Sequence, residues 1–162
     1  MKLTKEYFNE LFEYKDGKIY WKITKGRGNV GDEVGCMNSH GYRRIKLNQK
    51  EYATHRIIFL MHHGYLPEIV DHKDNNPLNN HIENLREATG QQNNFNSRRQ
   101  KNNTTGYKGV YYNKNIKKFC ARSKNMGTRT YLGDFNTAEE AYEAYCAYGR
   151  IHHGEFFNDG NK

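Results

Sequence analysis

The stretch from Val70 to Asn94, VDHKDNNPLNNHIENLREATGQQNN, limits the fold of this chain more than any other feature. Asparagine is a poor former of helices and strands and rarely fills a core, so this stretch cannot be buried throughout. Apolar residues make up 35% of the 162 residues, below the roughly 45–50% of average globular proteins. The sequence therefore predicts small layered modules, in one domain or two, and no single large core.

Positive charge is concentrated in the second half of the chain. The formal net charge is +8, and the 46 residues between Glu87 and Asp134 contain ten lysines and arginines and no acid. A stripe this one-sided is typical of surfaces that lie on phosphates. The alternative is an ordinary solvated basic face. The charge favours a polyanionic partner.

The cysteines and the amino terminus indicate a reducing compartment. Cys36, Cys120 and Cys146 are far apart, odd in number and without a CxxC pair, so neither a disulfide framework nor a cysteine zinc site is predicted. The opening MKLTKEYF lacks the apolar run of a signal peptide, and no stretch approaches the ~20 apolar residues of a membrane span. We expect a cytoplasmic protein.

Local signals divide the first half into short elements. LTKEYFNELFEY is typical of a helix capped by Thr4, with an apolar face formed by Phe8, Leu11 and Phe12. A turn at Asp16-Gly17 leads into a strand, and GYRRIKLNQKEYATH is typical of a hairpin that turns at its Asn-Gln pair. HRIIFLMHHG predicts a short buried helix that ends at its glycine.

The second half has a different pattern. Residues 98–104 are polar and basic without an apolar period, which predicts a linker. GYKGVYYN, KKFCARSK and RTYLGDF then indicate three short strands. A long amphipathic helix follows, with a capping box formed by Thr137 and Glu140 and an apolar face that includes Ala141 and Tyr145.

Asp71 and His72 are the strongest candidates for chemistry. Hydrolysis of a phosphodiester needs a metal ion that neutralises developing charge and a base that activates water. A carboxylate is a hard ligand for Mg²⁺ or Mn²⁺, and an imidazole can take a proton from water at neutral pH. Neighbouring side chains on a strand point to opposite faces, so both can serve one site only where the strand bends or ends. The segment KDNNPLNN supplies that break.

Two asparagines could complete such a site. The spacing Thr89-x-x-Gln92 predicts a capping box and a helix that begins at Gly90, which holds Asn93 in its first turns. The amide oxygen of Asn93 is a neutral hard ligand, and Asn84 could hold the loop through hydrogen bonds to backbone carbonyls. The simpler alternatives are that Asn84 fills a turn and that Asn93 caps its helix.

The other histidines have simpler interpretations. His55 is expected to pack or brace beside the site. The pairs His62-His63 and His152-His153 resemble zinc ligands only superficially, because adjacent histidines rarely converge on one ion. His81 and Asn79-Asn80 are expected in a turn at the surface, where they could touch DNA.

Residues 40–97 resemble the HNH endonucleases, especially the phage and intron-associated homing type. The shared features are the HR pair at His55-Arg56, the DHKD core, the ENLR segment and the QNN helix start, in order and spacing. The resemblance implies that His72 is the general base, that Asp71 and Asn93 bind the metal, and that Asn84 braces the loop. Many members carry a histidine at the last position, so metal preference is open. The cysteine-bound zinc of the family has no ligands here, and no structural zinc is expected.

Residues 104–157 resemble the ethylene-response-factor (Apetala-type) DNA-binding domain, through GYKGV, YLGDFNTAEEAYEAY and HHGEFF. The resemblance implies a three-stranded antiparallel sheet packed on one helix, with the exposed sheet face in the DNA major groove. An antiparallel sheet covered on one side leaves its other face in water. An uninvolved, solvated face is the alternative. We expect this face to carry Lys108, Tyr112, Lys118, Arg122, Lys124 and Arg129.

Together these patterns predict an α+β protein. Hairpin and helix elements lead into a ββα-metal nuclease core at about residues 55–97, within a nuclease domain at 1–97. A linker at 98–104 and a sheet-and-helix DNA-binding domain at 105–158 follow.

The expected function is endonucleolytic hydrolysis of double-stranded DNA with one divalent ion, Mg²⁺ first and Mn²⁺ as the alternative. We expect a monomer, which favours nicking, in the cytoplasm of a bacterial or phage-infected cell. One alternative is a DNA-binding regulator with a decayed nuclease module; the presence of Asp71, His72, Asn84 and Asn93 argues against it. A second is an RNA-directed or nonspecific nuclease.

Overall fold

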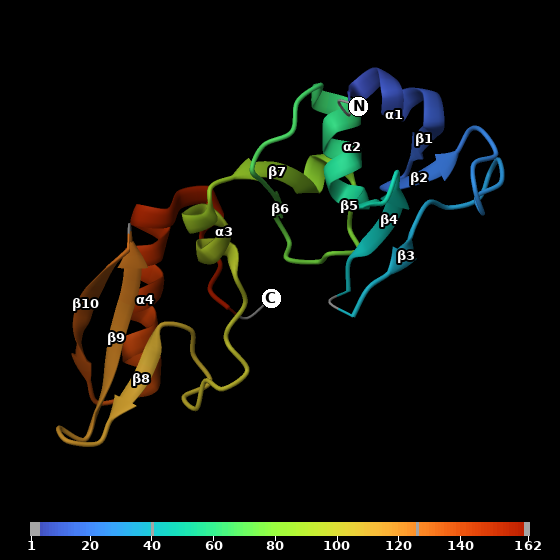
Figure 1. Ribbon diagram of the computed structural model, residues 1–162. Helices are drawn as coiled ribbons and strands as arrows, with labels where there is room; N and C mark the ends of the chain where they lie inside the picture. Colours follow the sequence, from blue (N-terminus) through green and yellow to red (C-terminus); the bar gives the residue numbers. More distant parts are fainter. Residues whose placement is uncertain (1–3, 40, 126, 161–162) are drawn as a thin grey trace. The chain divides into compact units, whose positions relative to one another are not determined.

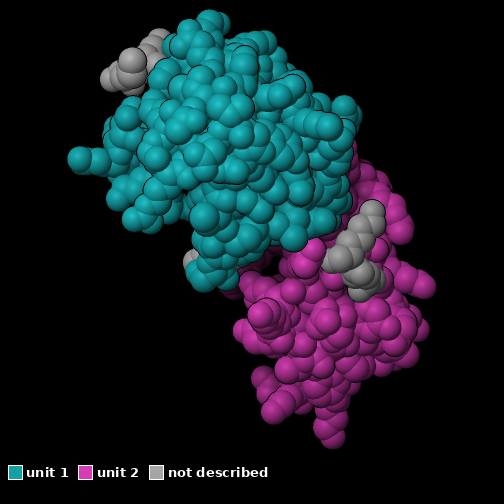
Figure 2. All heavy atoms as spheres, turned by 90° about the vertical axis from the view of Figure 1, so that its right-hand side faces the viewer, with its two compact units in different colours: residues 1–88 teal, residues 89–162 magenta. Residues whose placement is uncertain are grey.

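The protein is a mixed α+β chain of two compact units (Figure 1). The computed structural model describes residues 4–39, 41–125 and 127–160. Contacts divide the chain into residues 1–88 and 89–162, the teal and magenta units of Figure 2. Each unit has its own hydrophobic core. Within the described ranges, no helix is long and apolar enough to cross a membrane.

The first unit opens with helix α1 (Lys5–Leu11), whose N-terminus is capped by Thr4 as predicted. The predicted continuation of this helix through Phe12 is wrong, because strand β1 (Phe12–Lys15) begins there and pairs with β2 (Lys18–Trp21). The turn at Asp16-Gly17, with φ of 49° and 75°, folds the two strands together. Pairing with β2 therefore outweighs the helical pattern.

A second sheet lies in the order β3-β4-β5. Its strands are β3 (Cys36–Met37), β4 (Arg43–Leu47) and β5 (Lys50–Ala53). The predicted turn between β4 and β5 is confirmed at Asn48-Gln49, where both residues have positive φ, 47° and 64°. This left-handed backbone matches the twist of a two-residue hairpin.

Helix α2 (Thr54–His63) forms the centre of the first core. Five consecutive apolar residues, Ile57 to Met61, are buried, so the helix is enclosed on more than one face. It ends at Gly64, where φ of 79° is the left-handed cap that glycine adopts without strain.

Strands β6 (Ile69–His72) and β7 (Leu85–Ala88) form an antiparallel pair whose connecting loop ends in a 3₁₀ turn, η1 (Ile82–Asn84). Val70 and Leu85 belong to the same core as α2. The strand pair therefore positions the polar residues at its end against a rigid core.

Helix α3 (Gly90–Asn96) begins with the predicted capping box, in which the side chains of Thr89 and Gln92 each accept a backbone N–H of the other. By its contacts this helix belongs to the second unit. The succession β6, β7, α3 is thus continuous in sequence and divided between the units.

The second unit is a sheet in the order β10-β9-β8 with a helix on one face. Its strands are β8 (Val110–Asn113), β9 (Lys118–Asn125) and β10 (Thr128–Phe135). Helix α4 (Ala138–His153) starts at the predicted Thr137–Glu140 capping box and is followed by η2 (Gly154–Phe156). The predicted fold class is confirmed.

The helix lies very close to the start of the sheet. A Cβ at Gly109 would come within 2.2 Å of the Tyr145 ring, so only glycine fits there. Ala141 of α4 and Ala121 of β9 are fully buried between helix and sheet. These small residues let α4 pack closely on one face of the sheet, and the opposite face is the exposed one.

Candidate active site and nucleic-acid interface

Asp71 and His72 occupy the last two positions of β6, and each is only 5% exposed. The strand ends there because the chain turns, with the Asn75 N–H donating to the His72 carbonyl at 2.9 Å. Both side chains are therefore buried at the end of β6, where the asparagine-rich loop begins.

The Asp71 carboxylate is paired with Arg86, its cross-strand partner on β7. Arg86 Nε donates to Asp71 Oδ2 at 2.9 Å, and the side chains are 6% and 10% exposed for Asp71 and Arg86. A buried charge needs such a partner, because an unpaired one costs several kcal/mol. The pair fixes the orientation of the carboxylate.

The His72 ring is fixed by a buried hydrogen bond between its Nε2 and Asn80 Oδ1, 2.8 Å long. An amide oxygen only accepts, so in this hydrogen bond the His72 Nε2 is the donor. The expectation of a surface position for Asn80 is wrong: it is 6% exposed. The loop turns its side chain inward to the histidine, which no local pattern indicates.

His55, at the start of α2, packs beside His72. Their ring centroids are 4.9 Å apart, and Tyr42 contacts both rings. Burial, followed by electrostatic interactions with His72, Arg56 and Arg44, lowers the pKa of His55 to about 3. At neutral pH His55 is therefore an uncharged packing partner.

Asn84 holds the two ends of the loop together. Its Nδ2 donates to the Asn79 carbonyl at 2.7 Å and to Asp74 Oδ1 at 2.9 Å, and its Oδ1 accepts from the Asp74 N–H at 3.2 Å. Burial alone would raise the pKa of Asp74, but donors from Asn76, Asn79 and Asn84 outweigh it and lower that pKa. Hydrogen bonds from the asparagines of this loop thus converge on the Asp74 carboxylate.

Asn93 lies on the exposed side of α3, in the second unit, whereas Asp71 and His72 lie in the first. The opposite side of α3 is attached within the second unit. The Phe95 ring stacks on the buried His153 ring with centroids 3.7 Å apart, and Asn158 Nδ2 donates to Asn96 Oδ1 at 3.4 Å. The position of Asn93 is therefore set by the fold of the second unit.

The donors of the site suit a hard cation with few protein ligands. The Asp71 carboxylate supplies hard oxygen donors of the kind that Mg²⁺ prefers. Among the described residues, no three His, Cys, Asp or Glu side chains are grouped so that they could hold a metal. Mg²⁺ binds in this way, through one or two carboxylates, substrate phosphates and water.

The paired histidines do not converge. His62 packs on Tyr14 and His63 on Phe59. His153 stacks on Phe95, whereas His152 stacks on Tyr148, whose ring also meets His153 edge-on. His81 is exposed.

The sheet of the second unit presents a basic face away from α4. Along β9, Ala121 and Ser123 point to the helix, and Ser123 Oγ lies 3.3 Å from His153 Nε2. The alternate residues Lys118, Arg122 and Lys124 are exposed, and Lys124 is paired across the strands with Arg129. Four of the residues expected at the DNA therefore share one face.

Tyr112 is on the other side of the sheet. It is two positions after Val110 of the core and therefore shares the face of Val110. The ring centroids of Tyr112 and Phe119 are 5.0 Å apart. Its neighbour Tyr111 lies on the basic face instead, where the Arg122 guanidinium stands 4.7 Å above its ring centroid. Val110 is the apolar residue of this strand, so it could have been assigned to the core from the sequence. Alternation would then have placed Tyr112 on the same face as Val110 and Tyr111 on the opposite face.

Tyr131 was also missed by the sequence reasoning. It is paired with Arg122 across β9 and β10 and is 58% exposed. The aromatic and basic side chains are thus interleaved on this face, an arrangement suited to nucleic acid.

Lys108 does not contribute to the basic face. Its ammonium donates to the carbonyls of Phe95, Ser97 and Asn158 at 2.8, 2.6 and 2.9 Å. Burial is the main cause that lowers its pKa, to about 8. Lys108 therefore connects the end of α3 with Asn158 inside the second unit.

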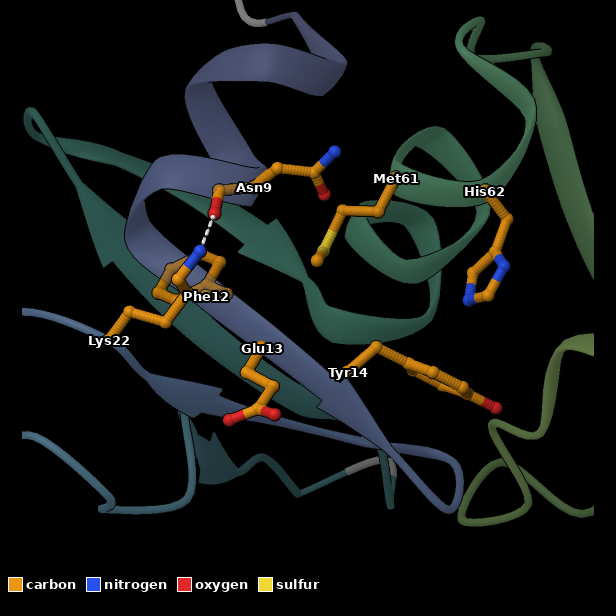
Figure 3. Close-up of a pocket in the computed structure, with 7 residues that line it drawn as sticks. All are labelled: Asn9, Phe12, Glu13, Tyr14, Lys22, Met61 and His62. Atoms are coloured by element: carbon orange, nitrogen blue, oxygen red, sulfur yellow. Dashed lines mark hydrogen bonds between the residues drawn. The ribbon is translucent and has the colours of Figure 1, made fainter.

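A separate cavity of about 390 Å³ lies between α1, β1 and α2 of the first unit (Figure 3). Phe12, Met61 and His62 line it, with Glu13 and Lys22 at its polar side. None of the predicted catalytic, metal-binding or DNA-binding residues lines this cavity.

Two families of known proteins match separate parts of the chain. Residues 52–95 match the HNH endonuclease family, and residues 105–150 match the AP2 domain. A stretch of 45 residues is 44% identical to Protein 3.8 of Escherichia phage T7, covering 28% of this chain and 37% of that protein. The match thus spans little more than a third of the length of that relative. No solved structure matches the chain.

Proposed function

Because the chain carries an HNH endonuclease domain followed by an AP2 domain, we propose that it is a metal-dependent endonuclease of the homing type that hydrolyses phosphodiester bonds in double-stranded DNA. The observation that carries the proposal is the buried His72 ring, whose Nε2 is hydrogen-bonded to Asn80. The residue before it in the chain is Asp71, whose carboxylate is paired with Arg86. A buried, oriented imidazole is suited to the activation of water.

His72 is the general base of this proposal. With its Nε2 proton directed to Asn80 Oδ1, its Nδ1 receives the proton of the attacking water. The neutral His55 packed on its ring adds no competing charge at neutral pH. Asn84 serves the reaction by keeping the loop that carries Asn80 closed.

Asp71 and Asn93 are the proposed metal ligands, and Mg²⁺ is the ion that their oxygen donors suit best. When bound, the ion neutralises charge that develops on the phosphate. Arg86 holds the Asp71 carboxylate in its orientation.

The sheet of the second unit is proposed as the grip on DNA. Lys118, Arg122, Lys124 and Arg129 on one face can reach phosphates or base edges, as a strand ribbon in a major groove does. We propose a nuclease domain at 1–97, a connection at 98–104 and a DNA-binding domain at 105–158. We further propose that the protein acts as a monomer that nicks DNA, in a bacterial or phage-infected cell.

His72→Ala tests the proposal. We expect cleavage of supercoiled plasmid to fall at least ~100-fold, because a positioned base typically contributes 10²–10⁴-fold. Binding of the same DNA in a gel shift should persist, since His72 is buried within the first unit and the proposed DNA-binding sheet belongs to the second.

The matched control is His63→Ala, an exposed histidine of α2, which should cut like the parent protein. EDTA should abolish cutting by both. Undiminished cutting by His72→Ala would remove His72 as the base. Uncut plasmid that is shifted by the parent protein would favour the non-enzymatic DNA-binding regulator, and a ladder on arbitrary DNA would favour a nonspecific nuclease.

A further inference from the structure

One carboxylate stands on the basic face of the second unit. Tyr111, Cys120 and Asp134 form a row across the three strands, since Cys120 of β9 is paired with Tyr111 of β8 and with Asp134 of β10. The next pairs along the same face bring Arg122 opposite Tyr131 and Lys124 opposite Arg129. Asp134 is exposed.

A backbone irregularity puts Asp134 on this face. Side chains three positions apart on a regular strand point to opposite faces. Between Tyr131 and Gly133 the register shifts, so Tyr131 is opposite Arg122 and Asp134 is opposite Cys120, two residues of β9 that share a face. Gly133 has a φ of 132°, which a residue with a side chain rarely adopts. Bulges of this kind redirect side chains at functional sites.

The carboxylate is charged at neutral pH. Hydrogen bonding by the nearby Cys120 thiol and Tyr131 hydroxyl lowers the pKa of Asp134 below its ordinary value. The same contact raises the pKa of Tyr131 to about 12, so the hydroxyl remains a donor. In the described part of the chain, none of the ion pairs includes Asp134. Its charge is therefore held in place without being cancelled by a cation in direct contact.

A fixed carboxylate on a surface that meets DNA is repelled by phosphates. It becomes favourable where it accepts a hydrogen bond from a base amino group, and the pairing of Asp or Glu with the N4 amino group of cytosine in the major groove is one such contact. Arg122, stacked on Tyr111 one row away, has the fork of donors that suits the O6 and N7 atoms of guanine.

We propose that Asp134 is a specificity residue that accepts a hydrogen bond from cytosine N4 in the major groove, on the sheet face shared with Arg122. This inference rests on the proposed binding of double-stranded DNA by the second unit. It assigns the bulge at Gly133 the task of presenting the acceptor, with Tyr131 and Cys120 as the residues that position it.

The experiment is selection of bound duplexes from a randomised library by the full-length protein, in EDTA so that no strand is cut. The parent protein is compared with Asp134→Asn, which replaces an acceptor-only group by an amide of the same shape. Glu143→Gln, an exposed acid of α4, is the control for the change in net charge. Melting curves verify that each variant is folded.

We expect the sites selected by the parent protein to contain one position that is predominantly cytosine. Asp134→Asn should lower the preference at that position at least about fivefold, because a good base contact discriminates by ≈ 1–3 kcal/mol. It should also raise affinity for unselected DNA, since a negative charge has been removed from the interface. Glu143→Gln should keep the cytosine preference.

Three results would overturn the inference. The first is an unchanged preference at every position in Asp134→Asn, which would leave Asp134 as a support for Tyr131. The second is selective loss of an adenine preference, which would contradict the cytosine assignment. The third is DNA binding by the parent protein without any base preference. Absence of DNA binding by the parent protein would instead contradict the proposed function itself.

Discussion

At His72 three groups that are neutral at pH 7 contact the imidazole ring. Asn80 supplies an amide oxygen, Tyr42 an aromatic ring and His55 an imidazole whose pKa of about 3 keeps it uncharged. Two charged imidazoles at a centroid distance of 4.9 Å would repel each other. Burial of His55 therefore keeps a second positive charge away from the His72 ring.

The low pKa of His55 predicts a stability that depends on pH. The folded pKa of about 3 lies below the ordinary value of 6.5, so between these values the unfolded chain binds the additional proton. The free energy of unfolding must then fall as pH is lowered from 6.5 towards 3, by at most about 1.4 kcal/mol per pH unit from this residue. Thermal unfolding between pH 7.5 and 4.5 measures this slope.

Replacement by His55→Gln should flatten that slope, because glutamine has no proton to gain. His63→Gln, on the exposed side of the same helix, should keep the slope of the parent protein. Equal slopes for the parent protein and His55→Gln would show that the burial of His55 does not control the acid sensitivity.

At the scale of elements, both ends of α3 are attached within the second unit, the first turn through the hydrogen bond from Gln91 to Asn125 and the last turn through Lys108. The Lys108 ammonium satisfies the carbonyls of Phe95 and Ser97 at that end and of Asn158 near the chain terminus. The last carbonyls of a helix have no partners within it, so a buried donor is valuable there. A helix of 7 residues depends on such external contacts.

Lys108→Met should therefore loosen α3. We expect the second unit to lose about 1–3 kcal/mol of unfolding free energy, the cost of leaving buried acceptors unsatisfied. Amides of residues 93–97 should exchange with solvent hydrogen faster in the variant. Lys101→Met, an exposed lysine in the following segment, is the control and should change neither quantity. Unaltered exchange at these amides would show that the stacking of Phe95 on His153 is sufficient.

Elements with a local signal were predicted correctly from the sequence. The capping boxes at Thr89 and Thr137, the turn at Asn48-Gln49 and the glycine stop at Gly64 each depend on a few adjacent residues. These interactions are complete within one or two turns of chain, so the residue pattern contains the information.

Features that depend on distant partners were not predictable in the same way. Phe12 leaves the helix because β2 is available to pair with it. Asn80 is buried because its amide is hydrogen-bonded to the His72 ring. Asp134 reaches the basic face because the pairing of β10 with β9 shifts between Tyr131 and Gly133. Lys108 looked like a DNA contact until its three carbonyl partners were known. Each outcome depends on residues that a local pattern does not include.

For the whole molecule, charge is separated along the chain. The 46 residues without an acid, from Ala88 to Gly133, include α3, β8, β9 and most of β10. Nearly all of this stretch belongs to the second unit. A unit with this charge gains affinity for DNA by releasing counterions, independently of base sequence. Catalysis and affinity are therefore assigned to residues that can be altered separately.

The salt dependence of DNA binding tests this assignment. For the parent protein, log affinity should fall linearly with log salt, with a slope of about −0.9 for each phosphate neutralised. Replacing the cross-strand pair by Lys124→Gln with Arg129→Gln should make the slope shallower by up to about 2. Lys46→Gln with Lys50→Gln, two exposed lysines of the first unit, removes the same charge and should leave the slope unchanged. A flat dependence in the parent protein, or an equal loss in both double variants, would mean that the basic face serves solubility and not DNA binding.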